Sequence, residues 1–300
     1  MDRLVIIGNG FDRAHNLPTS YYDFKEYLRI YAREFYEAIC KYIPEEELWF
    51  QFEMALGELD KYQVQEENAS YYLDYGDENW KDSANHDFQF MVEQDLAFAS
   101  YIPYYFKKWI EQIDTNVLPL VSKRIINNTC KILNFNYTDT LERAYKVPAE
   151  NILYIHGKAL SSKKLVVGHH DISTFQYGAV SPFNAEEHGI YIQDDDEDFR
   201  ITETKEIIKA YFQKTYKDTF GIIQMNQNFF DSLININEIF ILGHSLSSVD
   251  MDYFVEIRKR VLHSCKWYIS YFSESDLDNM EYFAKRLDIK NFQPVMLSNL

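Results

Sequence analysis

The chain has 300 residues and a formal net charge of −17, with 47 acidic residues against 30 lysines and arginines. A surface that follows the phosphates of nucleic acid needs clustered basic side chains, so this balance excludes nucleic acid as the main partner. Hydrophobic residues make up 46% of the chain and charged residues 26%. This composition is typical of a globular protein with a substantial core.

The cysteines and the apolar runs indicate where the protein works. Cys40, Cys130 and Cys265 are far apart and lack metal-ligand spacing, so we interpret them as reduced thiols in a cytoplasmic protein and expect no metal. The apolar run Leu4–Ile7 is too short for the core of a signal peptide. No apolar stretch approaches the roughly 20 residues that span a bilayer, and we expect no membrane partner.

Apolar runs typical of buried strands recur along the chain. The first, Leu4–Ile7, is continuous and ends at Gly8, as expected for a strand covered on both faces in a parallel sheet. Further strand-like runs lie at 131–135, 152–155, 165–167, 238–242 and 267–271.

Apolar residues at intervals of three and four predict helices between these runs. The predicted helices lie at 24–42, 44–56, 96–113, 207–220 and 254–261. Pro103 would kink the third helix. The acidic, tyrosine-rich region Gln65–Asp87 is predicted to be a long loop, and the acidic run Asp194–Asp198 a solvated loop.

This alternation predicts an α/β protein with a Rossmann-like, mostly parallel sheet, helices on both faces and a large helical insertion. We interpret residues 1–300 as a single α/β domain. The helical insertion would occupy about 24–128, and a second helical and acidic excursion about 185–235.

Polar and glycine-rich segments follow several predicted strands, at the strand ends where open α/β sheets bind ligands. In Gly8-Asn9-Gly10-Phe11-Asp12, two glycines permit a sharp turn and a close approach to a pyrophosphate. The third glycine and the ribose-binding acid of the standard dinucleotide fingerprint are missing. A tight structural turn and a cofactor loop therefore both stay open.

The second and third strand-end segments carry side chains that suit a ribose or a water. The amide of Asn136 can both donate and accept a hydrogen bond, whereas Asp139 suits a helix cap equally well. His156, beside Gly157, titrates near neutral pH and is placed to meet a ligand. A buried core histidine is the alternative.

The fourth segment, Gly243-His244-Ser245, permits close backbone approach, and its hydroxyl can bond phosphate or ribose. Ser247 replaces the second glycine of a nucleophile elbow, which argues against a serine hydrolase. Together, four segments at four strand ends carry more weight than any one of them alone.

These segments resemble a known family. Ile7–Asp12, followed by Leu17-Pro18-Thr19-Ser20-Tyr21, closely resembles the start of the abortive-infection AbiH family of bacterial phage-defence proteins. Phe135–Glu142, Ile155–Gly157 and Gly243–Leu246 fit that family as well.

The same segments resemble, in matching order, a degenerate sirtuin pattern. Gly8 and Gly10 take the positions of its glycine loop, His156 matches the histidine of its H-G motif, and Asn136 matches its asparagine. Asp12 replaces the usual serine. Cysteines of a zinc module are absent between His156 and Gly243, which disfavours a protein deacylase.

The resemblance implies a sirtuin-like antiphage NADase that hydrolyses NAD to nicotinamide and ADP-ribose. Asn136 would position a water or a ribose hydroxyl, His156 would be the general base, and Asp12 would bond ribose or orient the water. The implied dinucleotide-binding residues are Gly8, Asn9, Gly10, Phe11, Asp139, Gly243, His244 and Ser245. The partners compatible with such an effector are a further copy of the chain or a phage-sensing protein.

Two other interpretations compete with the NADase. In one, the pocket senses NAD or ADP-ribose and regulates a partner without chemistry. In the other, His169, His170 and Asp171 hold the metal of a phosphohydrolase. Neighbouring residues on a strand face opposite sides, which argues against that metal site.

Overall fold

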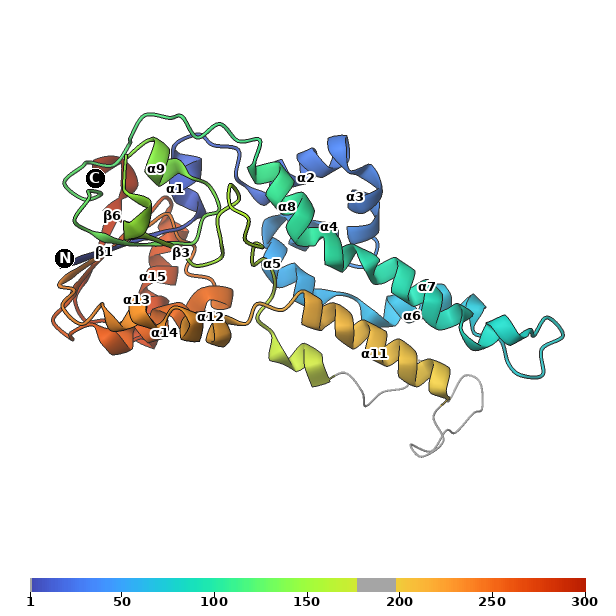
Figure 1. Ribbon diagram of the computed structural model, residues 1–300. Coiled ribbons are helices and arrows are strands. Elements are labelled where there is room, and N and C mark those ends of the chain that lie inside the picture. Colours follow the sequence, from blue (N-terminus) through green and yellow to red (C-terminus); the bar gives the residue numbers. More distant parts are fainter. Residues whose placement is uncertain (1, 177–197) are drawn as a thin grey trace. The chain divides into compact units, whose positions relative to one another are not determined.

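The computed structural model describes residues 2–176 and 198–300, and the chain forms an α/β, Rossmann-like fold (Figure 1). It divides into two compact units. The first contains Met1–Phe24, Pro103–Val166 and Asp218–Leu300, and the second contains Lys25–Ile102 and Val167–Lys217. The segment Lys25–Ile102 falls within the helical insertion that was predicted at about 24–128. The interpretation of residues 1–300 as one domain stays a prediction. The predicted acidic loop lies outside the described residues except for Asp198.

The first unit is built on a six-stranded sheet in the order β3-β2-β1-β4-β5-β6, in which every pair of neighbours is parallel. Its strands are β1 (Arg3–Ile7), β2 (Lys131–Asn134), β3 (Ile152–Tyr154), β4 (Glu238–Leu242), β5 (Lys266–Tyr271) and β6 (Phe292–Met296). Ile7 lies opposite Asn134 on one side and Leu242 on the other, so the carboxyl ends of the three central strands are level.

Both faces of this sheet are covered because β1 is apolar on both sides. Leu4 and Ile6 join one hydrophobic core, and Val5 and Ile7 join another. One face packs against α1 (Asn9–Ala14) and α9 (Thr140–Arg143) (Figure 1). The other packs against α12 (Thr219–Met225), α13 (Gln227–Asp231), α14 (Met251–Arg260) and α15 (Glu274–Arg286).

The five longest strand predictions are confirmed, and two details of the sheet differ from expectation. Leu165–Val167 is not a strand. Leu165 and Val167 are buried, while the N–H of Val166 donates to the His156 carbonyl and its own carbonyl accepts from the Tyr137 hydroxyl. A buried apolar run of three residues carries no periodicity that would separate a strand from an irregular segment. The unpredicted β6 is an edge strand that is mostly exposed and contains Pro294, which a sheet tolerates at its edge.

The second unit is helical, and its helix bounds differ from the prediction; the helix expected at 207–220 runs from Phe199 to Lys214. The expected helix 24–42 is interrupted at Ala32, and the expected loop 65–87 begins inside a helix. Pro103, which belongs to the first unit, does not kink a helix, because it lies in the first turn of one, where its missing N–H costs little. The remaining helices are α2 (Tyr21–Tyr31), α3 (Arg33–Ile39), α4 (Glu45–Phe50), α5 (Phe52–Ala55), α6 (Lys61–Asn68), α7 (Asp87–Leu96), α8 (Ile102–Ile110) and α11 (Phe199–Lys214).

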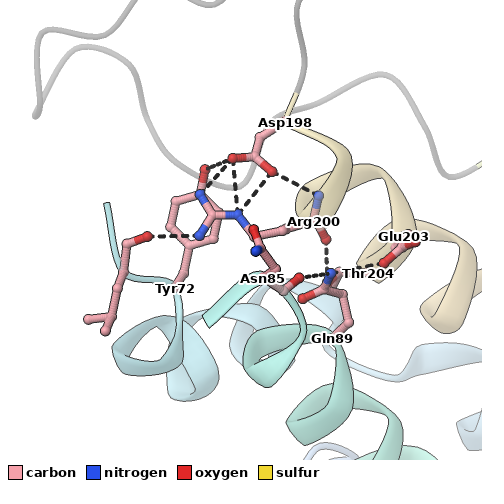
Figure 2. Close-up of polar contacts among 8 residues, drawn as sticks. Tyr72, Asn85, Gln89, Asp198, Arg200, Glu203 and Thr204 are labelled. Carbon is pink, nitrogen blue, oxygen red and sulfur yellow. Dashed lines mark hydrogen bonds and ion pairs between the residues drawn. The ribbon is translucent and has the colours of Figure 1, made fainter. Parts of the chain in front are cut away.

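A buried arginine fixes the start of α11 in this unit. Arg200 is 1% exposed and bonds the Asp198 carboxylate, while its Nη1 donates to the carbonyl of Leu73 at 2.8 Å (Figure 2). The guanidinium carbon also lies 4.0 Å from the centre of the Tyr72 ring. A charge this deeply buried is tolerated only when it is fully paired, so the cluster ties α11 to the segment after α6.

The candidate metal ligands of the second unit are bonded to the backbone instead. His169 Nε2 donates to the Phe212 carbonyl at 3.1 Å, and burial lowers the pKa of its imidazole. His170 Nδ1 lies 3.2 Å from the carbonyl of Lys217. Across residues 2–176 and 198–300 no group of three histidine, cysteine, aspartate or glutamate residues is arranged to hold a metal ion, so the phosphohydrolase interpretation finds no support.

Candidate functional site

The sheet order places a topological switch point between β1 and β4, because the strands that follow β1 extend to both sides of it. Ligands of open α/β sheets bind at the carboxyl edge next to such a point. The segments after β1, β2, β3 and β4 carry Asp12, Asn136, His156 and His244, so all four predicted segments follow strands of one parallel sheet and meet its carboxyl edge.

The glycines at this edge let two loops pack backbone against backbone. Gly8 N–H donates to the Leu242 carbonyl at 3.0 Å, and Gly10 N–H donates to the Gly243 carbonyl at 2.7 Å. A Cβ on Gly8 would lie 2.5 Å from His244 Cα. The immediate role of the glycines is therefore this close contact, and the N–H groups of Gly8 and Gly10 are already engaged in it.

A buried carboxylate lies at the ends of β1 and β2. Asp12 is 1% exposed, and Thr138 Oγ1 donates to its Oδ2 at 2.5 Å. Burial raises the pKa of Asp12, and hydrogen bonding to Thr138, Thr140 and Asn136 opposes that rise. A carboxyl group held in low dielectric by specific polar neighbours is typical of functional sites.

Asp12 and Asn136 face each other with unused hydrogen-bonding capacity. Among the described residues, neither Asp12 Oδ1 nor Asn136 Nδ2 has a well-formed hydrogen bond, although both atoms are buried. The Asn136 backbone N–H donates to Asn134 Oδ1 at 2.9 Å, which holds the loop after β2. An acceptor beside a donor matches the two needs of one hydroxyl group or one water.

Residues around this cluster were missed by the sequence analysis. His15 Nδ1 donates to the Phe11 carbonyl at 2.8 Å, and its Nε2 accepts from the hydroxyl of Tyr145 at 2.8 Å. Thr140 Oγ1 lies 3.1 Å from Thr138 Oγ1. His15 sits one helical turn after Phe11, and only the adjacent Asp12 could have drawn attention to it.

A second polar cluster lies at the ends of β3 and β4. His156 Nε2 is 3.5 Å from Asp250 Oδ1, and His244 Nε2 is 3.5 Å from Asp250 Oδ2. The Phe135 ring packs edge-on against both imidazoles, with centroid distances of 5.3 Å to His156 and 4.5 Å to His244. One carboxylate thus joins the two predicted histidines, whereas Asn136 belongs to the Asp12 cluster.

Most of the chain matches a known protein family. The model of a family described as bacteriophage abortive infection AbiH matches residues 4–271. The chain belongs to the AbiH family. The resemblance to the AbiH family is confirmed, and a role in phage abortive infection follows from the family, whereas the sirtuin-like core stays a prediction. Neither the curated proteins nor the solved structures yield a match to this AbiH chain.

The other predicted residues of the AbiH site hold the loops in place. Asn9 Nδ2 donates to the carbonyl of Thr19 at 2.7 Å, and Phe11 is wholly buried in the core. Asp139 stands at the N-cap position of α9, but its side chain does not cap the helix and instead accepts from Thr115 and from Arg143 Nε. Ser245 is exposed. A role of these residues in binding a dinucleotide stays a prediction.

One further absence concerns membranes. In the part of the AbiH chain that the structure describes, no helix has both the length and the apolar character needed to cross a bilayer.

The Asp12 carboxylate is expected to cost the AbiH protein stability at neutral pH. Its folded pKa is raised by burial, so its stabilising contribution is present in acid and is lost as the pH rises through that folded pKa. Asp12→Asn removes this titration, and Asn can still accept from Thr138. We expect the free energy of unfolding at pH 7 to increase by on the order of 1 kcal/mol, with a smaller gain at pH 5.

Urea unfolding at the two pH values measures this effect. Asp278→Asn, at an exposed position of α15, is the matched control and should leave the free energy of unfolding unchanged at both. A destabilised Asp12→Asn variant at pH 7 would contradict the conclusion that burial penalises the charged form of Asp12.

Proposed function

We propose that this AbiH protein is an antiphage effector that hydrolyses NAD to nicotinamide and ADP-ribose, and that its sheet and strand-end segments are a sirtuin-like core. The observation that carries the proposal is the buried, incompletely bonded pair of Asp12 and Asn136 at the carboxyl edge of the sheet. Next to the switch point, such a pair is suited to a ribose hydroxyl.

The proposed reaction needs no general acid to protonate the leaving group. Nicotinamide leaves with the electron pair of the bond to ribose C1′, and the pair neutralises its cationic nitrogen. The transition state carries positive charge on the ribose, as in glycoside hydrolysis. In our proposal Asp12 accepts from a ribose hydroxyl, Asn136 donates to the same oxygen, and the carboxylate stabilises the developing positive charge.

His156 supplies the base. It takes a proton from the water that attacks C1′, and a neutral imidazole near pH 7 suits that step. Since the Gly8 and Gly10 amides are engaged with β4 and its loop, we assign the pyrophosphate to the remaining groups of segments 8–11 and 243–245, including the exposed hydroxyl of Ser245. NAD is thus substrate, and no metal takes part in the proposed step.

The direct test is incubation of the purified full chain with NAD, alone and with lysate of phage-infected cells, which could contain a phage-sensing partner or trigger assembly. We expect NAD to fall and nicotinamide and ADP-ribose to rise in equal amounts; a parallel incubation with NADP tests the choice of dinucleotide. Saturable binding of NAD or ADP-ribose without product would establish the sensing module instead. Neither turnover nor binding under any condition would overturn both functions.

Cell fractionation completes the picture of a cytoplasmic effector. We propose that the protein acts in the cytoplasm, where the NAD pool is located. Recovery of the native protein in the membrane fraction or outside the cell would contradict this part of the proposal.

A further inference from the structure

Asp250 is a buried acid that the proposed reaction has not yet used. It is 7% exposed and lies directly before α14, at the end of the segment that follows β4. Each of its two carboxylate oxygens is 3.5 Å from the Nε2 atom of a different histidine, and both of those histidine side chains are 3% exposed. An acid in this position is costly to bury unless neighbouring donors face it.

The protonation of His244 is fixed by the backbone. Its Nδ1 accepts the N–H of Leu246 at 2.9 Å, so the ring proton is on Nε2, the atom that faces Asp250. Leu246 has a φ of 58°, a conformation unusual for leucine that brings its N–H back to the ring. His244 is therefore arranged to donate to one oxygen of Asp250 and to leave the other for His156.

We propose that Asp250 is the positioning residue of His156, and that His244 holds Asp250 in place for that task. This inference rests on the proposed NAD hydrolysis. Because Asp250 faces Nε2 of His156, it favours the tautomer with the proton on Nε2. This pairing fixes the orientation of the imidazole that serves as the base.

The step balances without any other reactant. The imidazole of His156 takes one proton from water, the water oxygen bonds to ribose C1′, and the bond from C1′ to nicotinamide breaks with its electron pair on the nicotinamide nitrogen. The positive charge that His156 acquires lies beside the Asp250 carboxylate, which stabilises it. This is the logic of an acid that orients and supports a histidine base.

Other titratable groups near His156 do not replace Asp250. The Tyr137 ring lies 6.3 Å from the imidazole and the Tyr253 ring 5.5 Å, measured between centroids. Among the contacts of the described residues, Asp250 is a charged group that lies against His156, with His244 on its other oxygen.

The test replaces Asp250 with Asn, which keeps the shape and removes the charge. We expect kcat to fall about 100-fold or more while KM for NAD stays within roughly threefold. The acidic limb of the pH profile should move to lower pH, because the imidazolium of His156 loses its counter-ion. Asp252→Asn, in the first turn of the same helix, is the matched control and should keep both kcat and the profile.

A measurement without NAD separates this inference from the proposed function. In the ring-proton NMR titration of His156, Asp250→Asn should move the midpoint to lower pH by about one unit or more. His244→Phe keeps the ring packing against Phe135 and removes a donor from Asp250, so the midpoint should move to higher pH. If Asp250→Asn fails to fold, His244→Phe carries the test alone.

The outcomes are distinct. If the unaltered protein leaves NAD intact but the two variants show the expected NMR shifts, the proposed reaction is overturned and the His156–Asp250 pair is kept. Turnover with an unaltered kcat, pH profile and His156 titration in Asp250→Asn would overturn the role of Asp250 alone. If that variant does not fold, an unshifted titration in His244→Phe has the same meaning.

Discussion

Gly243→Ala is expected to destabilise the first unit by roughly 3–5 kcal/mol. Gly243 has a φ of 65°, which disfavours any residue with a Cβ, and the added atom would lie 2.0 Å from the backbone nitrogen of Phe11. The added atom would meet backbone atoms of Gly10 and Phe11 at the start of α1, and these cannot turn aside as a flexible side chain can. The loops after β1 and β4 would have to separate.

Thermal and urea unfolding of purified Gly243→Ala protein measure the loss. Gly76→Ala is the matched control, since a Cβ there meets nothing within 4 Å, and it should unfold like the unaltered protein. If Gly243→Ala also unfolds like the unaltered protein, the backbone contact between the two loops is not as close as described.

This glycine shows what the sequence could and could not predict. A glycine after a buried strand indicates a sharp turn or a close approach of the backbone, and the sequence alone left a tight structural turn and a pyrophosphate-binding loop equally open. In the fold, Gly8, Gly10 and Gly243 come close to one another. Which loop packs against these glycines depends on the order of the strands in the sheet, and that order cannot be inferred from the residues around each glycine.

The sheet itself was largely predictable, because its strands are buried on both faces and are therefore continuously apolar. The apolar runs within Leu4–Ile7 and Glu238–Leu242 predict β1 and β4 in this way. The exposed edge strand β6 has no such signal. Helix ends were poorly predicted, since interruptions such as the one at Ala32 depend on tertiary packing and not on apolar spacing.

The candidate site was predictable in its strand-end residues and not in their partners. Asn136 and His156 stand out beside their strands, but Asp250 lies seven residues after Gly243, within a short helical segment. Its importance comes from the fold that brings it to two histidines. Likewise, the division of the polar groups into an Asp12–Asn136 pair and a His156–Asp250–His244 cluster could not be inferred from order along the chain.

Removing Asn136 or His156, two of the proposed catalytic groups, is expected to abolish most NAD turnover. Asn136→Ala deletes the donor beside Asp12, and His156→Ala deletes the base; each should lower kcat by about 100-fold to 10,000-fold. Asn151→Ala, before β3, and His263→Ala, at the surface, are matched controls that should keep full turnover. Quantifying released nicotinamide under conditions that activate the unaltered protein gives these rates.

The double variant tests whether the two clusters serve one transition state. If Asn136 stabilises the ribose while His156 activates the water, both act on the same event, and the combined loss in kcat should be much smaller than the product of the single losses. Unchanged unfolding midpoints in both single variants would exclude a loss of structure. Full turnover in either single variant would remove that residue from the mechanism. Full turnover in both single variants would overturn the proposed mechanism.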